Sequence, residues 1–145
     1  TGGEQAGFGY LLMAILTVWA TDTGAYYGGK ALGKRKLAPR VSPNKTCEGA
    51  IIGLACGVAT GVVVRWLGAA LMWWPHLGLG HSLVLAVITS LSGQMGDLAE
   101  SAFKRSAEVK DSGVFMPGHG GVLDRLDSLL LAIPLVYYYV RLFLS

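Results

Sequence analysis

Acidic and basic residues with the spacing of a phosphate-handling site are concentrated in the second half of this 145-residue sequence. Four of them, together with Ser101, recur at intervals of three and four residues, so a helix would carry them on one face: Asp97, Glu100, Lys104 and Arg105. Further along, Asp124 and Asp127 are three residues apart, with Arg125 between them. Carboxylate oxygens are hard ligands that suit Mg²⁺, and nearby cations stabilise phosphate charge. The pattern therefore predicts Mg²⁺-dependent phosphoryl or nucleotidyl transfer.

The same residues also fit simpler structural roles. Glu100 and Lys104 are four positions apart, where helices commonly carry a salt bridge, and acids in a first helical turn complement the helix dipole. Between the two acidic groups, the segment PGHGG at 117–121 would let backbone approach a ligand closely, because glycine has no β-carbon. His119 in that segment would donate a hydrogen bond to a phosphate or take part in proton transfer. Both interpretations stay open from the spacing alone.

The first half of the chain carries a second polar segment. Asp22 follows an apolar run, and an Asp at the centre of a membrane helix costs about 2.5–3.5 kcal/mol, which favours a functional role over a helix-end role. Ser42, Asn44 and Lys45 precede a predicted helix start at Thr46, whose free N–H groups suit a phosphate. The glycine-rich GGKALGK at 28–34 is not a P-loop, because Arg35 replaces the hydroxyl residue and no strand precedes it.

Four apolar stretches separate these polar segments. The chain is 52% hydrophobic and 14% charged, whereas soluble proteins average about 25% charged residues. The stretches run over 8–28, 49–67, 81–95 and 129–144. The second alone approaches the roughly 20 apolar residues that cross a bilayer. We predict an all-α polytopic membrane protein with about four transmembrane helices, in which residues 1–145 form one membrane-embedded catalytic domain.

The basic residues predict how this bundle is oriented. Two segments that four alternating spans would place on one side of the membrane hold ten of the twelve lysines and arginines: Lys30, Lys34, Arg35, Lys36, Arg40 and Lys45 in the first, and Lys104, Arg105, Lys110 and Arg125 in the second. The segment between them, 68–80, has none. By the positive-inside rule both basic segments face the cytoplasm. Cys47 and Cys56 are nine positions apart and predict neither a zinc site nor a disulfide.

The charged residues of the second half follow a known order as well. Ser101-x-x-Lys104-Arg105, Lys110-Asp111, Pro117-x-His119-Gly120-Gly121 and Asp124-Arg125-x-Asp127 together resemble the signature of phosphatidate cytidylyltransferases, also called CDP-diacylglycerol synthases. The segment from Asp22 to Gly49 is similar to the other cytoplasmic stretch of that family. The resemblance implies that CTP and phosphatidate react to CDP-diacylglycerol and pyrophosphate in phospholipid biosynthesis. It also implies that these residues form the C-terminal part of a longer enzyme.

The resemblance implies a set of site residues and partners. The principal Mg²⁺ ligands would be Asp97 and Asp124, supported by Asp127 and Asp22. The phosphates of CTP and phosphatidate would be held by Lys104, Arg105, Lys110 and Arg125, with Ser42, Asn44, Lys45, Ser101, His119, Gly120 and Gly121 completing the substrate site. The enzyme would be a multi-pass homodimer, in the inner membrane if bacterial, with a cytoplasmic active site and no nucleic-acid partner.

Two other functions stay open from the sequence. One is a CTP-dependent polyisoprenol kinase of the dolichol type, which would transfer a phosphoryl group and release no pyrophosphate. The other is a non-catalytic membrane bundle for transport or binding. A transporter would more typically bury its polar residues near the middle of the bilayer. Here the polar residues gather at the ends of apolar stretches, which favours an enzyme.

Overall fold

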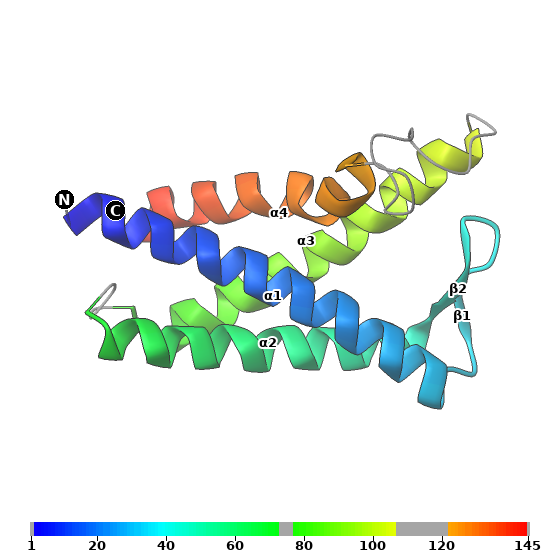
Figure 1. Cartoon of the computed structure of the whole chain (residues 1–145), viewed down its shortest axis with the longest axis horizontal. Helices are drawn as coiled ribbons and strands as arrows, with labels where there is room; N and C mark the ends of the chain where they lie inside the picture. Colours follow the sequence, from blue (N-terminus) through cyan, green and yellow to red (C-terminus); the bar gives the residue numbers. More distant parts are fainter. Residues whose placement is uncertain (1, 73–76, 107–121, 145) are drawn as a thin grey trace.

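The computed structural model describes residues 2–72, 77–106 and 122–144, which form four helices and one short hairpin (Figure 1). In chain order the elements are α1 (Gly2–Leu32), β1 (Lys36–Ala38), β2 (Ser42–Thr46), α2 (Cys47–Ala70), α3 (Leu79–Ser106) and α4 (Val122–Phe143). Among the described residues, α1, α2 and α3 are long and apolar enough to span a membrane, and α4 contains a shorter apolar segment, Ser128–Phe143. The predicted all-α membrane architecture is confirmed.

The polar ends of the elements lie together at one end of the bundle. The hairpin, the carboxyl end of α3 and the start of α4 lie toward one side of Figure 1, and both chain termini lie toward the other. α1 and α3 run toward the hairpin end, and α2 and α4 run away from it. The described basic residues of the two predicted cytoplasmic segments therefore meet at a single end, as the charge pattern predicts.

A stripe of glycines brings α1 and α2 into close contact. The buried glycines of α2 recur mostly every four residues along one face: Gly49, Gly53, Gly57, Gly61 and Gly68. A β-carbon on Gly53 would lie 2.6 Å from the carbonyl oxygen of Thr21 and 2.8 Å from the β-carbon of Ala25. Small residues at such spacing are a common device of membrane helices, because backbone contact replaces the hydrophobic driving force there. The stripe fixes α2 against α1.

Buried hydroxyl groups connect α1 to α3 in the middle of the bundle. Thr21 and Ser90 are both fully buried. The Thr21 hydroxyl lies 2.8 Å from the Thr17 carbonyl oxygen and 2.8 Å from the Ser90 hydroxyl. Buried apolar side chains of the bundle form two core clusters, which include Met13, Val18, Leu85, Leu129 and Val136. The hydrogen bond joins two helices that are distant in sequence.

The β1–β2 hairpin is held between α1 and α2 by hydrogen bonds from backbone N–H groups to side-chain oxygens. Thr46 caps α2, because its hydroxyl accepts a hydrogen bond from the Gly49 N–H at 3.1 Å, as predicted. The Glu48 carboxylate accepts hydrogen bonds from the N–H groups of Lys34 and Arg35, each at 3.1 Å to one oxygen. These contacts fix the start and the end of the hairpin. The sequence did not predict its strands, which are short, and β2 contains Pro43.

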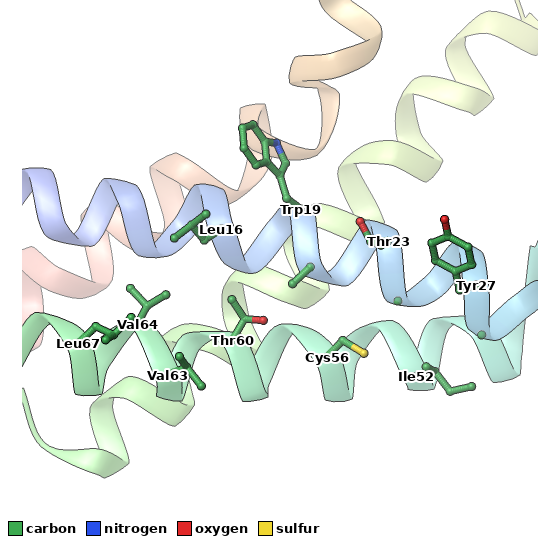
Figure 2. A pocket seen from close by; sticks show the side chains of 13 residues that line it. Leu16, Trp19, Thr23, Tyr27, Ile52, Cys56, Thr60, Val63, Val64 and Leu67 are labelled. Carbon is green, nitrogen blue, oxygen red and sulfur yellow. The ribbon is translucent and has the colours of Figure 1, made fainter.

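An apolar groove of about 780 Å³ follows the contact between α1 and α2 (Figure 2). Its lining comes from these two helices alone, from Leu16 to Gly28 on α1 and from Ile52 to Leu67 on α2. Trp19 and Tyr27, at 59% and 64% exposed, border it on the α1 side. Membrane lipid would cover such a surface. The predicted chemistry does not involve it.

Candidate active site

An ion pair at the polar end of the bundle joins the two predicted phosphate-handling segments. The Lys45 ammonium on β2 contacts the Asp97 carboxylate on α3. The two side chains are 29% and 32% exposed, so the pair lies at the surface of the bundle rather than inside it. Lys45 and Asp97 are 52 residues apart in sequence. The structure therefore brings a predicted substrate-binding lysine to a predicted metal-binding aspartate.

The other residues of this α3 face divide between local and long-range contacts. Lys104 pairs with Glu100, with 3.0 Å between the ammonium nitrogen and a carboxylate oxygen, which is the helix salt bridge that the four-residue spacing also allowed. The Arg105 Nε group donates a hydrogen bond to the Val41 carbonyl oxygen at 3.4 Å, in the turn of the hairpin. Ser101 is half-buried on the same face. Lys45 and Arg105 thus both connect the hairpin to α3.

Three helices meet one turn away from the predicted carboxylates. A β-carbon on Gly93 of α3 would lie 3.3 Å from a Val18 methyl group on α1 and 3.8 Å from the Ser128 β-carbon on α4. Asp22 follows Val18 by four residues, and Asp97 follows Gly93 by four. Position 124 precedes Ser128 by four residues on α4, which runs in the opposite direction. One helical turn toward the polar end therefore leads from this contact to all three acidic positions.

The carboxylates at this end are ligands that suit Mg²⁺, but Asp22 and Asp97 alone would not make a complete site. Asp22 is exposed, and Asp97 already holds a cation in the form of Lys45. Carboxylate oxygens are the ligands that Mg²⁺ prefers. Within the part of the chain whose side chains are described, no three Asp, Glu, His or Cys residues gather closely enough to hold a metal ion. A carboxylate site that includes Asp97 would therefore need acids whose side chains lie outside that part, as those of Asp124 and Asp127 on α4 do.

Several predicted site residues lie outside the described residues. These are Lys110, His119, Gly120 and Gly121. For Asp124, Arg125 and Asp127 the structure describes the backbone, in the first two turns of α4, and not the side chains. Ser42 and Asn44 lie on β2, the strand that carries Lys45, and Asn44 is exposed. Their predicted roles toward substrate and metal stay predictions.

Two polar residues of α3 with contacts to other helices were not predicted from the sequence. Gln94 donates from its side-chain amide to the Ala50 carbonyl oxygen of α2 at 3.2 Å, and Ser90 is the partner of Thr21. Both residues share the face of Asp97, at intervals of four and three residues. A polar stripe extending from the charged end into an apolar helix was the signal that could have identified them.

The chain has clear relatives along nearly its whole length. Residues 1–143 match the family described as "Cytidylyltransferase family". The chain is similar to three proteins named phosphatidate cytidylyltransferase: that of Bacillus subtilis (strain 168), 44% identical over 97% of this chain and 50% of the relative; that of Brucella suis biovar 1, 49% identical over 98% and 50%; and that of Staphylococcus haemolyticus, 48% identical over 90% and 48%. The chain spans about half the length of the curated relatives it matches. It belongs to the cytidylyltransferase family.

Proposed function

We propose that the protein transfers the cytidylyl group of CTP to phosphatidate, giving CDP-diacylglycerol and pyrophosphate. The observation that carries this proposal is the Lys45–Asp97 contact between β2 and α3, at the polar end of a bundle of membrane-length helices. Relatives that are 44–49% identical bear the name of this activity. A water-soluble nucleotide and a membrane lipid can both reach such a position.

The cationic residues of this end would bind the two phosphate-bearing substrates. An oxygen of the lipid phosphate attacks the α-phosphorus of CTP, the bond from that phosphorus to the bridging oxygen breaks, and pyrophosphate leaves with the electron pair. Lys45 and Arg105 lie beside the site on the hairpin and α3, where they would neutralise phosphate charge together with Lys104, Lys110 and Arg125. A phosphate monoester is ionised near neutral pH. No strong general base is therefore needed, and His119 keeps a binding role.

Asp97 would hold Mg²⁺ with Asp124, supported by Asp127 and Asp22. The ion, when bound, supplies positive charge to the phosphates of CTP. Asp97 cannot give its charge fully to Lys45 and to a metal at the same time. We expect Lys45 to turn from the carboxylate toward a substrate phosphate when the site is loaded. The hairpin that carries Lys45 would then move when substrate binds.

We place the polar end at the cytoplasmic surface of the membrane. The described lysines and arginines outside this end are Arg65 and Arg141, so the excess of positive charge fits the cytoplasmic side. The lipid phosphate would lie at this surface while the acyl chains stay in the bilayer. The homodimer and the absence of a nucleic-acid partner, which the family resemblance implies, stay predictions.

Transfer of label from CTP tests the proposed reaction. Membranes containing the protein, expressed from its complete coding sequence, are incubated with phosphatidate, Mg²⁺ and CTP labelled at the α- or the γ-phosphorus. The α-label should enter a CDP-lipid, and the γ-label should appear in pyrophosphate. Transfer of the γ-label to a polyisoprenol would identify the kinase instead. Absence of α-label from lipid, with the protein intact in the membrane, would overturn the proposal.

A further inference from the structure

α3 contacts four other parts of the chain through a single row of polar side chains. The row follows helical spacing, and each side chain reaches a different segment: Ser90 to Thr21 on α1, Gln94 to Ala50 on α2, Asp97 to Lys45 on β2, and Arg105 to Val41 in the hairpin turn. The last two belong to the candidate site. The Gln94 contact lies directly beside it and has no role in the proposed chemistry.

Gln94 joins α3, which carries Asp97, to α2, which begins soon after Lys45 of β2. Its amide nitrogen Nε2 donates to the Ala50 carbonyl oxygen at 3.2 Å. On α3, Gln94 precedes Asp97 by three residues, which is about one helical turn. On the other side, Ala50 lies in the first turns of α2, four residues after the cap Thr46, which directly follows Lys45. The hydrogen bond therefore lies one turn away from the Lys45–Asp97 contact on both sides.

This location determines what the hydrogen bond controls. The α2 carbonyl is a fixed backbone atom, so a donor that reaches it sets the distance between α2 and α3 at this level. An apolar side chain of the same length would fill the space without setting that distance. Polar side chains within membrane helices carry a cost unless they are partnered. Packing alone would not require an amide here.

We propose that Gln94 is a positioning residue for cytidylyl transfer. Its amide holds α3 against the start of α2, and so keeps Asp97 within reach of Lys45. The kinetic test of this inference rests on the proposed function. The test that measures distances rests on the Gln94 hydrogen bond alone. Catalytic groups need positions fixed to about half an ångström, and misplacement by about 1 Å can reduce a rate a hundred-fold.

The kinetic test compares Gln94→Met with the wild-type protein and with Ser92→Ala. Methionine keeps the length of the side chain and removes the donor. Ser92 is a buried polar residue of the same helix whose hydroxyl donates to the Ile88 carbonyl oxygen within α3, so Ser92→Ala is a matched control. We expect Gln94→Met to lower kcat ten- to a hundred-fold with little change in KM for CTP, and Ser92→Ala to leave both unchanged.

The structural test measures the distance between the hairpin and α3 without any turnover. Spin labels are attached at Asn44→Cys and Phe103→Cys, two exposed positions, in a protein whose Cys47 and Cys56 are replaced by serine. Pulsed electron paramagnetic resonance should show a broader distance distribution when this labelled protein carries Gln94→Met than when it keeps Gln94 or carries Ser92→Ala. The same broadening should appear with and without CTP.

The outcomes separate this inference from the proposed function. A lower kcat with an unchanged distance distribution would overturn the inference, because Gln94 would then act on the substrate directly. Unchanged kcat and distances would overturn it as well. If the unsubstituted protein shows no cytidylyl transfer while Gln94→Met still broadens the distances, the proposed function fails and the positioning of α3 by Gln94 stands.

Discussion

At the residue scale, the Lys45–Asp97 contact has two interpretations that a charge swap separates. A purely structural ion pair would contribute the same stability after the two charges exchange positions. If instead Lys45 binds phosphate and Asp97 binds metal, exchanging the charges would remove both functions. The single variants Asp97→Asn and Lys45→Met should each lower cytidylyl transfer by about a hundred-fold or more, because each removes charge placed for the transition state.

The double variant Lys45→Glu with Asp97→Lys separates the structural from the functional interpretation. We expect it to recover the thermal stability lost by the single variants, because opposite charges again face each other, and to stay as inactive as they are. Recovery of both stability and activity would mean that the pair serves only to hold the hairpin on α3. Glu4→Gln, an exposed acidic residue in the first turn of α1, is the control for loss of a carboxylate elsewhere.

The Thr21–Ser90 hydrogen bond gives a second prediction at this scale. Its hydroxyls lie 2.8 Å apart and are fully buried. Interhelical hydrogen bonds in membrane proteins average about 0.6 kcal/mol and reach about 1.7 kcal/mol. We expect a coupling energy in this range from a double-mutant cycle of Thr21→Val and Ser90→Ala, measured by unfolding in lipid bicelles.

The control cycle pairs Thr21→Val with Thr89→Val. The Thr89 hydroxyl donates to the Leu85 carbonyl oxygen within α3, at 2.7 Å. The hydroxyls of Thr21 and Thr89 share no hydrogen-bond partner, so the two substitutions should be close to additive. A coupling energy for Thr21 and Ser90 no larger than that of the control would contradict the interhelical bond.

At the scale of elements, the glycine face of α2 determines how closely α1 can approach. A β-carbon on Gly53 would overlap the Thr21 carbonyl oxygen and Ala25. We expect Gly53→Ala to destabilise the bundle by about 1–3 kcal/mol, the usual cost of overpacking. Gly7→Ala on α1 is the matched control, because nothing lies within 4 Å of a β-carbon there. It should be neutral or stabilising, and equal effects of the two variants would contradict the close contact.

The elements also show how far the sequence alone could lead. The helices followed from apolar runs, and the start of α2 from Thr46, because both signals are local. The hairpin did not follow, since β1 and β2 are short and are fixed by Glu48 and Arg35, whose hydrogen bonds join residues 12 to 14 positions apart. The row of Ser90 and Gln94 was visible as spacing, but the carbonyl that Gln94 reaches depends on packing of α2 on α3.

For the site, too, the sequence predicted single residues but not the contacts between them. The sequence predicted Asp97 as a metal ligand and Lys45 as a phosphate-binding residue, and both roles stay predictions. It could not show that they touch, because a hairpin absent from the prediction brings them together. The alignment of Asp22, Asp97 and position 124 on one level depends likewise on the contact of Val18, Gly93 and Ser128, which no local pattern encodes.

At the scale of the whole molecule, the two ends of the bundle differ in charge. The hairpin end carries Lys45, Lys104 and Arg105. At the other end, Arg65 donates through Nε to the Leu77 carbonyl oxygen at 2.9 Å, and His81 lies 2.9 Å from the Tyr139 hydroxyl. α3 connects the ends over 28 residues, about 42 Å of helix, which exceeds the thickness of the hydrocarbon core. The ends should therefore lie at opposite membrane surfaces.

Cysteine labelling from either side of sealed vesicles tests this topology. In a protein whose Cys47 and Cys56 are replaced by serine, Asn44→Cys marks the hairpin and Gly80→Cys marks the exposed start of α3. A membrane-impermeant maleimide should modify Asn44→Cys only in inside-out vesicles and Gly80→Cys only in right-side-out vesicles. Labelling of both from one side would contradict a spanning α3. The reverse pattern would place Asp97 outside the cytoplasm, away from CTP, and would contradict the proposed reaction even if the fold is correct.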